Sequence, residues 1–152
     1  MLNTRKATTK DINDLIRLRK CQLQDEGQEP DTDIDDSLRH FFYEKMIGNE
    51  LIEWVAEEED GRLVASAAIL FMDFPPSFVH PAAGKTGYIT NVYTEDAYRG
   101  QGIAGMLLRQ LEKEARRKGI KRLMLHASKM GIRAYEKSGY AETDRVMEKK
   151  ID

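Results

Sequence analysis

The chain has 152 residues, of which 41% are hydrophobic and 33% charged, a composition that fits one globular domain large enough to bury a core. Its formal net charge of −2 excludes the strongly basic surface of a typical nucleic-acid-binding protein. The single Cys21 excludes an internal disulfide, and no group of cysteines and histidines has the spacing of a metal site.

Charge and hydropathy restrict the location and the ligands. No apolar run is long enough to cross a membrane, and the N-terminus lacks the apolar segment of a signal peptide, so we expect a cytoplasmic protein with no membrane partner. Residues 1–61 carry 16 acids and 8 bases, whereas the remaining residues carry 10 acids and 16 bases. Solvated helix faces would explain this asymmetry. The alternative is an anionic ligand on the C-terminal half and a cationic one nearer the N-terminal half.

Hydrophobic periodicity, capping residues and turn residues predict the secondary structure. Thr8 and Asp11 have the spacing of a capping box, and the dipeptide Asp60-Gly61 is a hairpin signal. In chain order, we expect a strand over 5–7, helices over 12–24 and 35–47, strands over 51–58, 62–72 and 87–94, a helix over 102–118, a strand over 122–128, a short helix over 132–137, and one or two strands from 140 onward. This order predicts an α/β (α+β) fold with a single domain over 1–152, in which helices flank a mixed sheet.

A long connection, DFPPSFVHPAAGKT, separates two of the predicted strands and holds three of the four prolines. A loop of this length inside a compact domain is usually functional or disordered. Its Phe74, Phe78 and Val79 argue against plain disorder. We therefore expect residues 73–86 to flank a binding site.

The stretch YRGQGIAG contains a literal G-x-G-x-x-G between a predicted strand and a predicted helix. A nicotinamide-binding Rossmann site would also need an acid at the end of the next strand, where the sequence reads His-Ala-Ser, and too few residues follow for its remaining units. The glycines still allow the main-chain N–H groups of residues 100–105 to approach an anion at the positive end of the helix dipole. A pyrophosphate suits this loop, with Arg99 beside it; the alternative is a tight turn without a ligand.

The segment RGQGIA, residues 99–104, resembles the Gln/Arg-x-x-Gly-x-Gly/Ala signature of the GNAT superfamily of acyl-CoA-dependent N-acyltransferases. NVYTEDAYRGQGIA is similar to the strand–turn–helix unit of that family, and HASKMGIRAYEKSGY is similar to its second motif. The resemblance is strongest over residues 87–140. It implies a GNAT-like domain: a mixed, mostly antiparallel sheet of six to seven strands, about four flanking helices, and a splayed parallel pair of strands at the cofactor site.

The resemblance also implies roles for particular residues, with acetyl-CoA as the donor. Val92, Tyr93 and Thr94 would pair through their main chain with the pantetheine arm, as an added strand would. Tyr135 matches the tyrosine that in many relatives protonates the departing CoA thiolate; the alternative for it is packing on a short helix. The implied donor site consists of Val92, Tyr93, Thr94, Arg99, Gly100, Gln101, Gly102, Ile103, Ala104, Gly105 and Ser128, the last standing where many relatives carry an Asn.

The general base is not marked by the resemblance, because Leu123 stands where some relatives place a Glu. The candidates are Asp73, Glu53 and His126, or a water chain; the alternative is an amine that arrives already neutral. A main-chain N–H of the bulged strand, that of Val92, would stabilise the oxyanion. For the acceptor site we expect Glu26, Phe41, Phe42 and Asp73. The carboxylates of Glu26 and Asp73 suit a cationic amine.

The function that follows is N-acetyl transfer from acetyl-CoA to a primary amine of a small molecule or peptide, by direct attack of the amine. The alternative is a non-catalytic acyl-CoA-binding sensor or interaction module with the same fold. We expect acetyl-CoA and an amine acceptor as ligands, with no metal and no nucleic acid. A homodimer is one option for assembly, since relatives are often dimers.

Overall fold

The computed structural model describes residues 2–81, 85–129, 131–143 and 146–151. Its elements are β1 (Asn3–Lys6), η1 (Thr9–Asp11), α1 (Ile12–Asp25), α2 (Asp35–Ile47), β2 (Leu51–Glu57), β3 (Leu63–Asp73), β4 (Lys85–Thr94), η2 (Asp96–Tyr98), α3 (Ile103–Arg117), β5 (Leu123–Met124) and α4 (Ile132–Lys137). The four predicted helices are confirmed to within two residues, and the predicted capping box of Thr8 and Asp11 forms. None of the described helices is long and apolar enough to cross a membrane.

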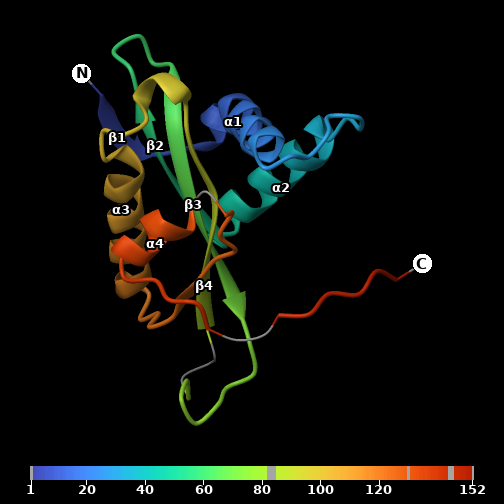
Figure 1. The fold of residues 1–152 in the computed structure, drawn as a ribbon, viewed down its shortest axis with the longest axis vertical. Helices are drawn as coiled ribbons and strands as arrows, with labels where there is room; N and C mark the ends of the chain where they lie inside the picture. The colour runs from blue at the N-terminus through green and yellow to red at the C-terminus, as the bar shows by residue number, and fades with distance from the viewer. Residues whose placement is uncertain (1, 82–84, 130, 144–145, 152) are drawn as a thin grey trace.

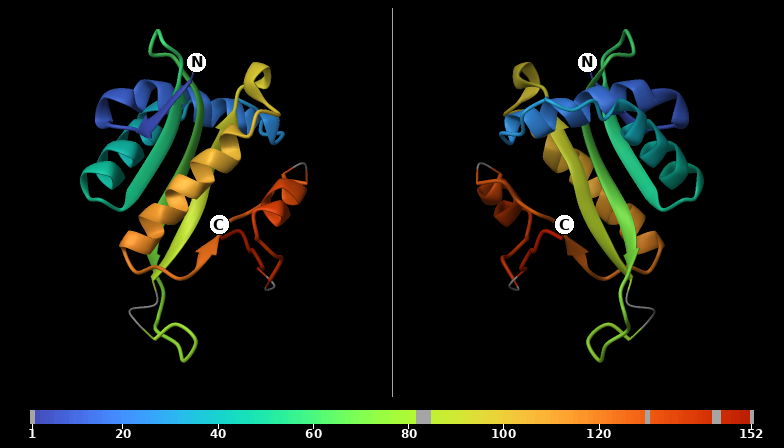
Figure 2. Two further views of the ribbon diagram at one scale, coloured as in Figure 1. Left: turned by 90° about the vertical axis from the view of Figure 1, so that its left-hand side faces the viewer. Right: turned by 90° about the vertical axis from the view of Figure 1, so that its right-hand side faces the viewer.

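The strands form one sheet in the order β1-β2-β3-β4-β5. The first three pairings are antiparallel and β4–β5 is parallel. Helices α1 and α2 cover one face of the sheet and α3 covers the other (Figure 1). Figure 2 shows α4 beyond β4, at the opposite edge of the sheet from α2. The predicted mixed, mostly antiparallel α/β fold is therefore confirmed.

The number of strands differs from the prediction. The described residues form five strands rather than six to seven. The predicted strand over 122–128 is reduced to β5, which pairs only with Gly87 and Tyr88, and residues 140–143 and 146–151 form none of the predicted final strands. Residues 144, 145 and 152 lie outside the described residues. A parallel neighbour follows β4 only up to the point where a bulge bends that strand away.

Two apolar clusters hold the helices on the sheet, one on each face. The α3 side is lined by the stripe Ile103, Leu107, Leu111 and Ala115, which recurs at the spacing of a helix face and packs on residues of β3 such as Ile69. The other side joins α1 and α2 to β2 and β3 through Leu15, Leu18, Phe42, Val55 and Leu63. The central strands are therefore buried on both faces, which fixes the position of β4 and of the loop that follows it.

Candidate active site

One edge of β4 is open next to a bulge in the same strand. Because β5 pairs with β4 only at Gly87 and Tyr88, the next six residues of β4 have no strand partner on that side among the described residues. On the other side, the register with β3 shifts between Ser66 and Ala68, and Asn91 adopts a positive φ of 55° there. The splayed parallel pair is thus present, and its open edge includes the residues expected to pair with the donor, 92–94.

The glycine loop connects this open edge to α3. Gly100 and Gly102 have φ values of 77° and 79°, a conformation that other residues rarely adopt, and no heavy atom lies within 4 Å of a Cβ built on either. No side chain of the described residues caps the start of α3, so its first N–H groups remain available at the positive end of the helix. Gly105 instead lies inside α3. Two of the three motif glycines therefore shape the loop, and the third does not.

Arg99, which the sequence places beside an expected pyrophosphate, already has partners. Its Nη1 lies 2.7 Å from Asp96 Oδ1, its Nε donates to the Thr94 carbonyl at 2.8 Å, and its guanidinium lies 5.5 Å from the centre of the Tyr93 ring. Nη2 reaches Asp25 at the end of α1. The cation is held at the edge of the glycine loop, next to the exposed Gln101.

Tyr135 lies on α4 and packs edge-to-face on Tyr140, with ring centres 5.9 Å apart. It also packs against the apolar cluster on the α3 side, as Val92 does. Burial raises the pKa of the Tyr135 phenol, and the field of the Glu26 carboxylate raises it further. The phenol is therefore protonated at neutral pH, as a proton donor must be.

Ser128 shapes the turn into α4. Its hydroxyl accepts a hydrogen bond from the Gly131 N–H at 3.2 Å, and its carbonyl accepts from the N–H groups of Gly131 and Ile132 at 3.0 and 3.1 Å. The side chain expected to contact the donor thus has an internal partner. Its visible role is to orient the helix that carries Tyr135.

A pair that the sequence did not indicate lies between β4 and the segment after β5. The Tyr88 hydroxyl and His126 Nδ1 are 2.7 Å apart, and the two rings meet edge-on. Burial raises the pKa of the Tyr88 phenol, the field of Arg19 lowers it, and the field of Glu26, which also acts on Tyr135, raises it. Glu26, at the end of α1, is therefore the expected acceptor-site residue that the structure brings towards both tyrosines. In the sequence, Tyr88 is marked only by its place in the predicted strand over 87–94.

The other residues expected around the acceptor lie elsewhere. Phe42 is completely buried in the α1–α2 cluster, and Phe41 packs against that cluster with its ring centre 6.0 Å from that of Phe42. Asp73 pairs with Lys85, six residues before Asn91, or about 20 Å along the strand. The described part of the loop 73–86 projects beyond this end of the sheet (Figure 1), whereas the glycine loop lies towards the other end. Residues 82–84 are outside the described residues.

Of the three candidate bases, Glu53 is the one beside the bulge. It is 2% exposed, and its Oε1 accepts a hydrogen bond from Asn91 Nδ2 at 3.3 Å. Burial raises the pKa of the Glu53 carboxyl to about 8, although the hydrogen bond from Asn91 and the field of Arg19 act in the opposite direction. Asp73 is exposed at the far end of β3, and His126 is exposed and bound to Tyr88.

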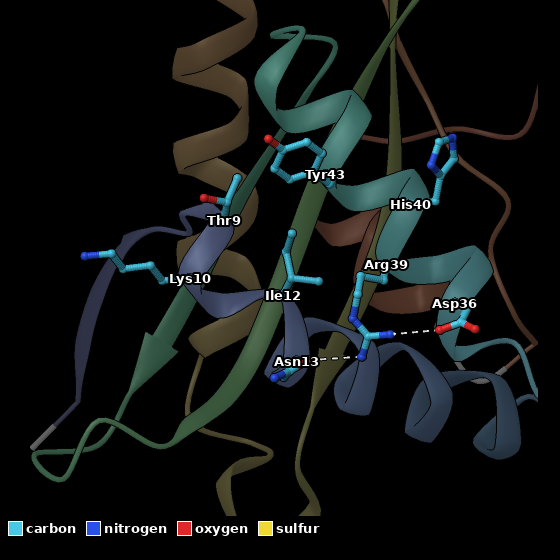
Figure 3. Close-up of a pocket in the computed structure, with 8 residues that line it drawn as sticks. All are labelled: Thr9, Lys10, Ile12, Asn13, Asp36, Arg39, His40 and Tyr43. Atoms are coloured by element: carbon cyan, nitrogen blue, oxygen red, sulfur yellow. Dashed lines mark hydrogen bonds and ion pairs between the residues drawn. The ribbon is translucent and has the colours of Figure 1, made fainter.

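A groove of about 490 Å³ lies away from these residues, between the start of α1 and α2. Figure 3 shows Arg39 spanning it, with hydrogen bonds of 3.2 Å to Asn13 and to Asp36. The groove is lined by Thr9, Lys10, Ile12, Asn13, Asp36, Arg39, His40 and Tyr43. None of them is an expected donor or acceptor residue, so the groove is separate from the candidate site. In the described part of the chain, no cluster of three or more His, Cys, Asp or Glu could hold a metal ion.

Comparison with known proteins gives a consistent result. Residues 12–140 match the family model described as Acetyltransferase (GNAT) family. The fold is similar to that of a predicted acetyltransferase from Clostridium acetobutylicum, crystallised with acetyl-CoA, with a TM-score of 0.94 and 47% identity over 99% of this chain and 96% of that one. A GCN5-related N-acetyltransferase from Ralstonia eutropha JMP134 is 28% identical, with a TM-score of 0.90 and 99% of both chains covered.

The sequence alignments with curated proteins cover a smaller share of this chain than the structural matches do. A glucosamine 6-phosphate N-acetyltransferase of Trypanosoma brucei brucei is 31% identical over 87 residues, which make up 57% of this chain and 56% of that protein. The chain spans about half the length of the curated relatives it matches.

Proposed function

The chain belongs to the acetyltransferase (GNAT) family, and from that premise we propose that it moves an acetyl group from acetyl-CoA to a primary amine of a small molecule or peptide. One observation carries the proposal. The open edge of β4 is followed, after the short η2, by a glycine loop and the uncapped start of α3. One extended ligand with a diphosphate at its end can use both features, because its amides complete the strand while its charge meets the helix terminus.

The donor is held mainly by main-chain groups. Residues 92–94 offer N–H and C=O groups to the amides of the pantetheine arm, and the N–H groups of Gly102 and of the first turn of α3 face the diphosphate. The positive φ of Gly100 and Gly102 and the open space around them let phosphate oxygens come close to the backbone. That a similar chain of Clostridium acetobutylicum was crystallised with acetyl-CoA supports this assignment.

The chemistry follows from the position of the thioester at the bulge. The amine nitrogen attacks the carbonyl carbon, forming a C–N bond, and the tetrahedral oxyanion is stabilised by the N–H of Val92. The C–S bond then breaks, and the sulfur takes a proton from the Tyr135 phenol. The attacking nitrogen, neutral when it reacts, loses one proton to water on becoming an amide, and the Tyr135 phenolate regains a proton from water. A phenol kept protonated by burial is a suitable acid for a thiolate, whose thiol has a pKa of about 8.5.

The acceptor approaches from the side of α1. Glu26 at the end of this helix gives the approach a negative charge, which favours a cationic amine, while the neighbouring Asp25 is paired with Arg99. Glu26 acts on both Tyr88 and Tyr135. An amine held by Glu26 would therefore lie near the acid that completes the reaction.

The test is release of free CoA thiol from acetyl-CoA in the presence of an amine panel: glucosamine 6-phosphate, putrescine, and a short peptide with a free α-amino group and one lysine. Product mass identifies the acetylated nitrogen. We expect turnover with at least one member. Tight binding of acetyl-CoA without thiol release on the whole panel would instead support a non-catalytic acyl-CoA sensor.

A further inference from the structure

A buried polar cluster lies beneath the β4 bulge, on the face of the sheet covered by α1 and α2. Glu53 stands opposite Ala68, which in turn stands opposite Thr90. The neighbours of Glu53 at two-residue spacing, Leu51 and Val55, both belong to the α1–α2 cluster, so Glu53 points to the same side. The small Ala68 leaves room for the long side chain to cross β3 and reach Asn91 on β4.

This cluster fixes the conformation of Asn91. A positive φ of 55° is unfavourable for residues with a side chain, and asparagine adopts it more readily than most. Its side-chain Nδ2 donates to Glu53 Oε1 at 3.3 Å, and its main-chain carbonyl accepts from Ser66 Oγ at 2.9 Å. The two hydrogen bonds tie its side chain to β2, two strands away, and its main chain to the adjacent β3. They hold the bulge at the point where β4 leaves its regular register.

The carboxyl of Glu53 lacks an ion-pair partner among the described residues. Arg19 on α1 is the one charged group whose field reaches it, while Ser66 on β3 and Asn91 on β4 are its polar neighbours. Burial in this setting disfavours the charge and raises the pKa of Glu53 to about 8. Below that pH the side chain is neutral, and its carbonyl oxygen accepts the hydrogen bond from Asn91.

We propose that Glu53 is a positioning residue for acetyl transfer, which holds Asn91 through its hydrogen bond and thereby keeps the β4 bulge in the shape that receives the thioester. The proposal rests on the proposed function, since it needs the donor carbonyl at the bulge. Ionisation of Glu53 would place a negative charge beneath the carbonyl oxygen on which negative charge develops during the reaction. That charge opposes the oxyanion, although the ionised carboxylate still accepts the hydrogen bond from Asn91.

The decisive variant is Glu53→Gln, which keeps the size and the oxygen that accepts from Asn91 and stays neutral at every pH. Turnover of wild type and variant is compared from pH 6.5 to pH 9 with acetyl-CoA and the most active member of the amine panel. Titration of the amine and of CoA affects both proteins equally and cancels in the ratio. With a pKa of about 8, about one tenth of wild-type Glu53 stays neutral at pH 9, so the ratio of variant to wild-type turnover should rise from about one to about tenfold.

Two further variants test the assignment to this residue. Glu57→Gln changes a partly buried carboxylate on the same strand, which is paired with Arg5, and should leave the ratio flat. Glu53→Leu removes the partner of Asn91 and should lower turnover at every pH. If Glu53→Leu does not fold, Asn91→Gly, which accepts the positive φ but removes the side chain, takes its place with the same expectation.

Two results would overturn the proposal. Loss of turnover in Glu53→Gln at every pH would show that Glu53 acts as a proton acceptor and not as a positioning residue. A ratio of variant to wild-type turnover that does not change with pH would show that the charge of Glu53 does not affect the reaction. The dissociation constant of acetyl-CoA, measured by calorimetry at pH 6.5 and at pH 9, provides a readout that needs no acceptor. At pH 9, wild type should bind acetyl-CoA more weakly than Glu53→Gln does. If wild type releases no thiol with any amine, the proposed function fails, and this binding ratio still tests the role of Glu53.

Discussion

Arg99 Nη2 lies 2.8 Å from Asp25 Oδ2, an ion pair that joins the glycine loop to the last turn of α1. About half of each side chain is exposed, so the pair contributes only about 0–1 kcal/mol. A pair this weak keeps Arg99 in place without preventing its use by another anion. It connects the expected donor side of the molecule to the helix end that carries Glu26.

The first prediction concerns this pair. Arg99→Ala should raise the dissociation constant of acetyl-CoA about fivefold, which corresponds to about 1 kcal/mol for one exposed charge beside a diphosphate. Asp25→Asn should leave the affinity unchanged or improve it, because Arg99 loses a competing carboxylate. Calorimetry at low and high salt measures both effects. An equal loss in the two variants would mean that the pair is needed only to shape the loop.

The second prediction separates backbone strain from ligand contact at Gly102. Gly102 and Gly119 both have positive φ, 79° and 72°, with no heavy atom within 4 Å of an added Cβ. Alanine at either position should therefore lower the free energy of unfolding by about 1–2 kcal/mol. Gly102→Ala alone should also weaken acetyl-CoA binding, by at least tenfold. If the two variants bind acetyl-CoA with similar affinity, measured after checking their melting temperatures, the diphosphate does not bind at this loop.

The third prediction concerns the acid. Tyr135→Phe should lower turnover by about a hundredfold or more while leaving the acetyl-CoA dissociation constant unchanged, because the ring still packs and only the proton is lost. Tyr140→Phe is the matched control, since the Tyr140 hydroxyl is buried without a hydrogen-bond partner among the described residues. That control should keep its turnover and its stability. Full turnover in Tyr135→Phe would reduce the tyrosine to a packing residue.

The fourth prediction is a pH dependence of stability. The unfolded chain releases the Glu53 proton near its ordinary pKa of 4.5, whereas the folded protein retains it up to about pH 8. Between these values the folded state binds one more proton, so this residue lowers the free energy of unfolding by about 1.4 kcal/mol for each pH unit of increase. Glu53→Gln does not titrate. Its stability relative to wild type should therefore rise by roughly a few kcal/mol from pH 5 to pH 8, as measured by urea unfolding. A difference that stays constant with pH would show that Glu53 has an ordinary pKa in the fold.

The sequence predicted those parts of the site whose signals are local. The glycines at 100 and 102 indicated a loop with unusual backbone, and the apolar stripe of α3 predicted the helix that follows it. Both depend on residues within a few positions of one another. The parallel pairing of β4 with β5 also followed, because a helical crossover between two strands allows that arrangement.

The parts that were missed depend on contacts between distant segments. The bond from Asn91 to Glu53 requires the registers of three strands, which no local pattern specifies. Phe42 was expected at the acceptor site, but the orientation of α2 turns it into the core. Asp73 was grouped with the site through its long loop, although an antiparallel hairpin carries that loop to the far end of the sheet.

The shortness of β5 has a mechanical consequence. Among the described residues, strand pairing joins the chain from β5 onward to the sheet at two residues of β4, with the Tyr88–His126 contact and the packing of Tyr135 beside it, whereas α3 is anchored along its whole buried stripe. Local opening should therefore cost less free energy at α4 than at α3, and amide hydrogens should exchange much faster there. We therefore expect Tyr135, the proposed proton donor, to belong to a different cooperative unit from the glycine loop, and a ligand that contacts both would join two units that open separately without it.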